Sequence, residues 1–142
     1  MGIADAFHDL EADFELLGEW DERYQHVIDL GRGLPPLSDA ERSDDNRVRG
    51  CASPVWLVSK PNADGTINYR ADSEARIVRG LIAILLQIYS DRAPAEILAF
   101  DAKGAFERLG LPSALSMQRS NGLFSMVERI RRDAAAAAEP AA

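Results

Sequence analysis

The feature that most constrains the fold is an apolar segment at residues 74–90. Its apolar side chains cover most of the circumference of a helix, which predicts a helix buried at the centre of the molecule. They are Ile77, Val78, Leu81, Ile82, Ile84, Leu85, Leu86, Ile88 and Tyr89. Asp72-Ser73 is expected to cap the first turn. Gly80 costs a helix about 1 kcal/mol relative to alanine, which indicates a close backbone contact with a sheet. The longest apolar run within it, Leu81 to Ile88 with Gln87 inside, is far too short to span a bilayer.

The segment before this helix has the pattern of a β-hairpin. Residues 55–60 and 66–71 contain β-branched and aromatic side chains of the kind that strands favour. The turn between them, 61–65, ends in Asp64-Gly65, which is a strong hairpin signal. Residues 45–49 are a candidate for a further short strand.

Helices are expected on both sides of this hairpin. They occupy residues 3–17, 20–30, 94–100, 101–110, and a last helix that begins near 116–120. Apolar spacings of three and four residues predict the first two. Pro94 suits the first turn of a helix, Asp101 is an N-cap, and Gly110 is a C-terminal stop.

This order of elements predicts an α+β fold, with helices packed on one face of a small antiparallel sheet. The 142 residues fit one domain. We expect that domain at 1–133 and a disordered, alanine-rich tail at 134–142. The N-terminus lacks the basic and apolar order of a signal peptide, so the expected compartment is the cytoplasm, without membrane association.

Charge and cysteine content exclude several classes of function. The formal net charge is −7, whereas a general nucleic-acid binder needs a basic face for the phosphates. The single cysteine, Cys51, cannot form an internal disulfide. It also rules out metal sites that need two or more thiolates.

Cys51 lies in a loop that leads into the first predicted strand, which is a common place for a reactive group. Gly50 allows a sharp turn just before the thiol. Ser53 is expected to bond a nearby amide and fix the loop. Arg47 and Arg49 favour the thiolate if they point toward it. The alternative is that Cys51 is a buried, small apolar filler.

Three motifs in this chain resemble the SufE family of sulfur acceptor proteins. They are Asn46-x-Val48-x-Gly50-Cys51-x-Ser53-x-Val55-Trp56, Asp72-Ser73 followed by Ile77-Val78-Arg79-Gly80-Leu81-Ile82-Ala83, and Leu115-Ser116-x-x-Arg119-Ser120-x-Gly122-Leu123. They occur in the family's order and on the elements predicted above. The resemblance spans residues 10–132 and implies a SufE-like fold, which is similar to that of iron–sulfur scaffold proteins.

The resemblance implies a function in sulfur transfer. Cys51 is expected to take persulfide sulfur from a PLP-dependent cysteine desulfurase of the SufS or CsdA kind and to stimulate that enzyme. The sulfur then passes to a SufBCD-like scaffold complex for iron–sulfur cluster assembly. Thiol exchange of this kind needs only one acceptor thiolate. The chain is therefore expected to bind no metal and no cofactor, since the PLP belongs to the desulfurase, and to be an accessory protein rather than a stand-alone enzyme.

Other residues gain expected roles from the same resemblance. Arg119 matches an arginine of the C-terminal signature, and it is expected to hold the loop or to offset the charge of a persulfide. Asp72 is matched too, and its role is either helix capping or partner docking. The chain departs from the family at Ala52 and Pro54, where glutamine is usual. The loop therefore loses two amide side chains and the N–H of residue 54.

Three other interpretations stay open at this point. An iron–sulfur scaffold would need about three thiolates, and the chain has one. A pure interaction module would carry Cys51 only as a structural residue. A thiol hydrolase would need His8 or His26 as the base for Cys51.

Overall fold

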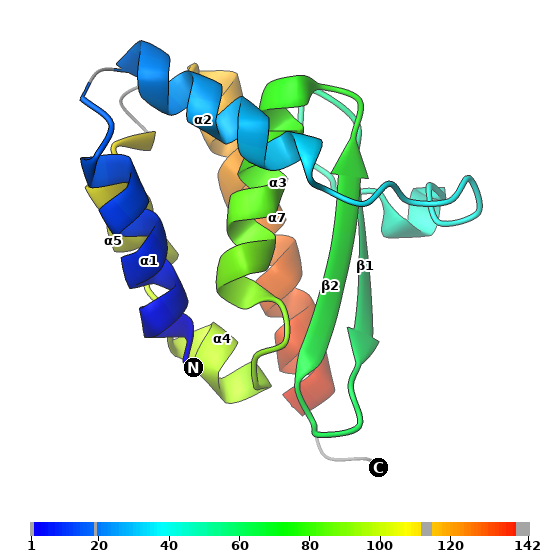
Figure 1. Ribbon diagram of the computed structural model, residues 1–142. Coiled ribbons are helices and arrows are strands. Elements are labelled where there is room, and N and C mark those ends of the chain that lie inside the picture. The colour runs from blue at the N-terminus through cyan, green and yellow to red at the C-terminus, as the bar shows by residue number, and fades with distance from the viewer. Residues whose placement is uncertain (1, 19, 112–114, 139–142) are drawn as a thin grey trace.

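The computed structural model of the chain describes residues 2–18, 20–111 and 115–138. Two helices come first, a hairpin follows, and further helices complete the chain (Figure 1). The elements are α1 (Ile3–Glu15), α2 (Trp20–Arg32), the 3-10 helix η1 (Asp44–Asn46), β1 (Val55–Pro61), β2 (Ile67–Ser73), α3 (Arg76–Tyr89), α4 (Pro94–Ala99), α5 (Ala102–Leu109) and α7 (Met117–Ala138). Within these described residues, no helix is both long enough and apolar enough to cross a membrane.

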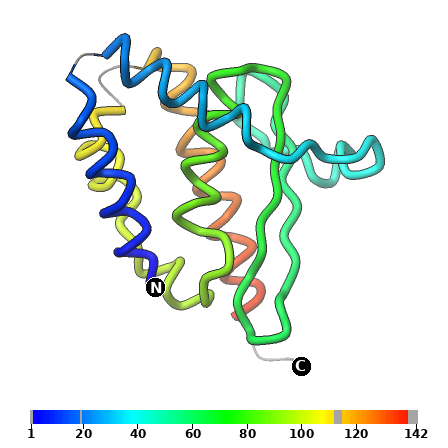
Figure 2. Tube along the Cα trace, viewed as in Figure 1, coloured from blue at the N-terminus to red at the C-terminus, as the bar shows by residue number. Residues whose placement is uncertain are grey.

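The elements form layers beside the hairpin. In Figures 1 and 2, α3 and α7 lie between the hairpin and the pair α1 and α5, and α2 crosses one end of α3. The predicted α+β class, with helices on one face of a small antiparallel sheet, is confirmed. The core lies around α3, between these layers.

The hairpin is the only sheet in the described part of the chain. β1 and β2 pair antiparallel, from Val55 opposite Ser73 to Pro61 opposite Ile67. β1 ends one residue later than predicted, and β2 begins one residue later and ends two residues later. The prediction of a short strand at 45–49 is wrong. The chain there forms η1 and then a single bridge between Arg47 and Trp56, because Asp44 and Asp45 start a helical turn rather than an extended run.

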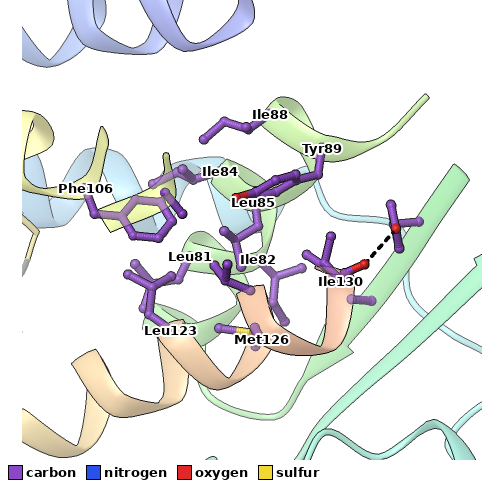
Figure 3. Close-up of a cluster of buried hydrophobic side chains, with 14 of the residues drawn as sticks. Leu81, Ile82, Ile84, Leu85, Ile88, Tyr89, Phe106, Leu123, Met126 and Ile130 are labelled. Atoms are coloured by element: carbon purple, nitrogen blue, oxygen red, sulfur yellow. Dashed lines mark hydrogen bonds between the residues drawn. The ribbon is translucent and has the colours of Figure 1, made fainter. Parts of the chain in front are cut away.

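The central helix α3 is buried as predicted, and Figure 3 shows its side chains meeting those of α5 and α7. The hydroxyl of Tyr69 on β2 donates to the carbonyl of Ile130 at 3.1 Å and so ties the hairpin to α7. Gly80 does make a close backbone contact, but with α2 and not with the sheet. A Cβ on Gly80 would lie 2.1 Å from the carbonyl oxygen of Val27. Gly31 faces the same crossing, since its own Cβ would lie 2.6 Å from the nitrogen of Gly80.

The later helices begin and end largely where their sequence signals stand. Pro94 occupies the first turn of α4, and the side chain of Asp101 accepts from the N–H of Gly104 at 3.1 Å. Gly110 ends α5 in the left-handed conformation, with φ of 73°. The last helix does not fray at residue 134 as expected. Ala134 is fully buried and α7 continues to Ala138, because alanine is both a strong helix former and small enough to pack. Residues 139–142 of the predicted tail lie outside the described residues.

Candidate functional site

The Cys51 loop crosses α7 at close range. The N–H of Val48 donates to the carbonyl of Val55 at 2.8 Å, which closes the base of the loop. Gly50 has a φ of +92°, a backbone conformation that costs free energy for any residue with a Cβ. A Cβ at this position would lie 2.4 Å from the Oγ of Ser125 on α7. Gly50 therefore provides both the turn and the room for the loop to rest on the helix.

The thiol of Cys51 lies against α7 at Gly122, about one turn before Ser125. Its Sγ is 3.5 Å from the carbonyl oxygen of Gly122, within reach of a weak S–H hydrogen bond. A Cβ at Gly122 would lie 3.7 Å from the Sγ and 3.8 Å from the Cα of Cys51. A side chain at position 122 would therefore fill the space beside the sulfur. Glycine leaves that space open.

A cavity of about 350 Å³ opens beside the thiol. Its walls come from three segments of the chain: the Cys51 loop, α3 and the start of α7. The apolar part comes from Val78, Leu81, Leu123 and Met126, and the polar part from Ser53, Ser116, Gln118 and Arg119. The arrangement places one sulfur nucleophile in the wall of a chamber that both apolar and polar side chains line.

Arg119 and Cys51, which the sequence separates widely, line the same cavity. The backbone N–H of Arg119 donates to the hydroxyl of Ser116 at 3.2 Å, which fixes the first turn of α7. Within residues 2–18, 20–111 and 115–138, the guanidinium of Arg119 makes no ion pair or hydrogen bond. Its charge is thus available to an anion in the cavity.

The protonation of Cys51 is set by two opposing effects. Burial raises the pKa of the thiol above its ordinary value of 9.0, and the charge of Arg47 lowers the pKa in part. The thiol is therefore mostly protonated at neutral pH while the loop is closed. Arg49, the other arginine expected to favour the thiolate, lines a different groove.

Contacts that the sequence did not reveal hold both ends of the loop. Arg129 on α7 donates to the carbonyl of Asp45 at 3.2 Å and to that of Arg47 at 3.3 Å. The hydroxyl of Ser73 donates to the carbonyl of Pro54 at 2.6 Å. No sequence signal near the loop pointed to either anchor, since both come from elements distant along the chain.

The family departures at Ala52 and Pro54 lie in this loop. Ala52 lines the cavity and is exposed, while Pro54 still offers its carbonyl to Ser73. Ser53 also lines the cavity. In the described part of the chain its side chain makes no hydrogen bond, so the expected bond to a local amide is not formed there.

Asp72 does not cap α3, as one of its two expected roles required. The N-cap of α3 is Ala75, and Asp72 is still part of β2. Its carboxylate is fully buried, accepts from Arg42 at 2.7 Å, and pairs with Arg79 at 3.1 Å. Arg79 also donates to the carbonyl of Leu34 at 2.9 Å. Asp72 thus joins the segment before η1 to β2 and α3, and a partner would meet its arginines rather than the carboxylate itself.

Neither histidine lines the cavity. His8 on α1 lies 3.6 Å from Glu11, and His26 on α2 packs against Phe14 with ring centroids 5.6 Å apart. The histidine base that a thiol hydrolase needs is therefore not beside Cys51. In the portion of the chain that the structure describes, no group of three or more His, Cys, Asp or Glu side chains could hold a metal ion.

Comparisons with known proteins agree with this geometry. The family described as "SufE: Fe-S metabolism associated domain" matches residues 8–134. An uncharacterized SufE-like protein of Rhizobium etli is 49% identical over 125 residues, covering 86% of this chain and 84% of that protein. A second one, from Rhizobium meliloti, is 45% identical over 125 residues, covering 86% and 89%.

A solved structure shows the same fold. The solution structure of a hypothetical protein from Thermus thermophilus superposes with a TM-score of 0.76 at 18% identity, over 93% of this chain and 95% of that one. The family match extends over most of the chain, and the family points to sulfur transfer with a cysteine desulfurase. The chain belongs to the SufE family of proteins associated with iron–sulfur metabolism.

Proposed function

We propose that Cys51 is the sulfur acceptor of this chain, and that it carries a persulfide between a cysteine desulfurase and an iron–sulfur scaffold complex. The observation that carries the proposal is the position of the thiol. Cys51 lines a cavity of about 350 Å³ whose walls are part apolar and part polar, with Gly122 leaving room beside the sulfur. A persulfide is one sulfur atom longer than a thiol, so it needs this kind of sheltered space.

The transfer is an exchange between thiols. The Cys51 thiolate attacks the outer sulfur of the donor persulfide, a new S–S bond forms on Cys51, and the donor's own S–S bond breaks. The donor cysteine leaves as a thiolate, so no oxidant or reductant is consumed. The proton of the Cys51 thiol passes to solvent or to a base of the partner before the attack.

In this proposal the thiol has two states, one with the loop closed over it and one in which water or a partner reaches it. In the closed loop the raised pKa keeps Cys51 protonated and poorly nucleophilic. Contact with water or with a partner removes the desolvation that raises the pKa, and Arg47 then favours the thiolate. After transfer, the return of the loop places the persulfide in the cavity that Arg119 borders, where the guanidinium offsets its negative charge.

The PLP that generates the donor persulfide belongs to the desulfurase of the SufS or CsdA kind. The recipient is a SufBCD-like complex. By removing the persulfide from the desulfurase, the chain stimulates turnover of free cysteine. We place this relay in the cytoplasm, where a lone thiol stays reduced.

Stimulation of the desulfurase tests this function. Alanine released from free cysteine is measured for a desulfurase alone, with the wild-type chain, and with Cys51→Ser. The wild type is expected to raise the turnover and Cys51→Ser is expected not to. Ser53→Ala, a substitution in the same loop, serves as the matched control and should still stimulate. Equal stimulation by Cys51→Ser and the wild type would remove Cys51 from the reaction.

A further inference from the structure

A second groove, of about 470 Å³, runs along α7 and is lined by Arg49 from the Cys51 loop. Its charged lining comes from Arg49, Glu128, Arg129, Arg131 and Arg132, four arginines against one glutamate. This concentration of positive charge is unusual in a chain whose formal net charge is −7. The mechanism proposed above makes no use of the groove itself.

The arginines of this groove differ in whether they already form ion pairs or hydrogen bonds within the chain. Arg129 pairs with Asp133 at 3.4 Å, and Arg131 donates to the carbonyl of Leu98 at 2.9 Å. Arg49 and Arg132 are exposed, and in the described ranges neither makes an ion pair or hydrogen bond. Two guanidinium groups therefore face solvent unpaired, beside two others that are held in place.

The shape of the groove suits a peptide segment better than a single small anion. It follows α7 from Ser125 to Ala135, ten residues apart, which is about 15 Å of helix. Leu98 and Ala135 add apolar surface to the arginines. Guanidinium groups bind carboxylates in a bidentate way.

The groove is joined to the sulfur site through the loop itself. Cys51 rests on Gly122 of α7, Gly50 rests on Ser125 one turn later, and Arg49 then reaches the groove. The thiol and Arg49 thus line two different cavities, although only Gly50 separates them in the sequence. A segment bound in the groove contacts the loop two residues away from the reacting sulfur.

We propose that this arginine groove docks an acidic segment of a protein partner in sulfur transfer. The identity of that partner as a sulfur-transfer protein rests on the function proposed above, whereas the binding of acidic peptide does not. Carboxylates of the segment pair with Arg49 and Arg132, and docking there brings the partner beside Cys51.

Fluorescence anisotropy with a labelled oligoglutamate peptide of about ten residues tests the groove, at low salt because such contacts are screened. The double variant Arg49→Gln/Arg132→Gln is expected to bind about tenfold more weakly than the wild type, since it loses two charge-assisted contacts. Arg32→Glu is the matched control, because it changes the net charge by the same two units at an exposed position on α2. It should weaken binding less than twofold. Arg49→Lys/Arg132→Lys keeps the charge and should bind within a few-fold of the wild type.

Three results would overturn the proposal. They are equal weakening by the double variant and by Arg32→Glu, absence of peptide binding to the wild type, and binding of phosphatidylglycerol vesicles or inorganic phosphate in preference to the peptide. Sulfur uptake by Cys51 from a desulfurase is measured on the same proteins. Failure of uptake in the wild type would refute the proposed function, while peptide binding reports on the groove alone.

Discussion

The Sγ of Cys51 lies 3.5 Å from the carbonyl oxygen of Gly122, a residue 71 positions further along the chain. This contact joins the reactive loop to the first turns of α7, where Arg119 borders the same cavity. α7 therefore helps to hold the loop, together with Ser73 on β2, and it also supplies part of the walls of the chamber. Changes on α7 should alter sulfur chemistry at Cys51 without touching the cysteine.

Gly122→Ala should reduce the protection of a persulfide. The added Cβ would lie 3.7 Å from the Sγ, an ordinary contact that the fold tolerates but that fills the space beside the sulfur. We expect the persulfide to lose its sulfur to dithiothreitol several-fold faster than in the wild type, measured as the rate of sulfide release. Gly18→Ala is the control, because a Cβ there meets nothing within 4 Å. Equal rates for both variants would contradict the role of Gly122.

Gly50→Ala should destabilise the chain through two effects that can be separated. The positive φ costs about 1–2 kcal/mol for a residue with a Cβ, and the contact with Ser125 adds to that cost. Gly65→Ala has a similar φ of +88° with open space around it, so it reports on backbone strain alone. Urea unfolding should show a larger loss of unfolding free energy for Gly50→Ala than for Gly65→Ala. The difference should shrink when Ser125→Gly is added to both variants.

Asp72→Ala should be among the most destabilising substitutions in the chain. It leaves Arg42 and Arg79 without their buried carboxylate; because these arginines are themselves 31% and 26% exposed, we expect a cost below the value of about 3–5 kcal/mol for a pair whose remaining charge is buried. Asp29→Ala removes the partner of Arg32 in an exposed pair and should cost less than about 0.5 kcal/mol. Thermal and urea unfolding compare the two. A small effect of Asp72→Ala would show that the cluster does not hold the segment before η1.

The reactivity of Cys51 should rise with pH in a way that Arg47 controls. Burial raises the pKa of the thiol above its ordinary value, so the rate of alkylation by iodoacetamide should keep increasing through the pH range in which a free thiol is already ionised. Arg47 lowers the pKa, and Arg47→Gln should therefore slow alkylation at pH 8. Arg49→Gln, in the same loop, should leave the rate nearly unchanged. An equal effect of the two variants would contradict a specific role for Arg47.

The sequence predicted the elements better than the contacts between them. The hairpin, the buried α3 and the caps at Asp101 and Gly110 carry local signals, namely alternation, apolar coverage and cap residues, and the structure confirms them. Gly80 also signalled a close approach. Its neighbour could not be read from the sequence, because a glycine shows that space is needed and not which element uses it.

In the candidate site, too, the sequence predicted local features better than contacts between distant segments. The motif around Cys51 identified the loop, but not its anchors: Arg129 carries no local signal, and Ser73 was expected to cap α3 rather than to bond the loop. The expectation that Asp72 caps α3 is wrong, although an aspartate just before a helix commonly does so. Its burial depends on Arg42 and Arg79, which only the tertiary structure brings together.

The mass of the intact chain after incubation with a cysteine desulfurase, PLP and free cysteine tests the central claim most directly. The account predicts a gain equal to one sulfur atom, which is removed by reductant and absent from Cys51→Ser. Several desulfurases are tried in parallel, so that a mismatched pair does not decide the result. No gain with any of them, together with unchanged turnover of each, would contradict the account and return Cys51 to a structural role.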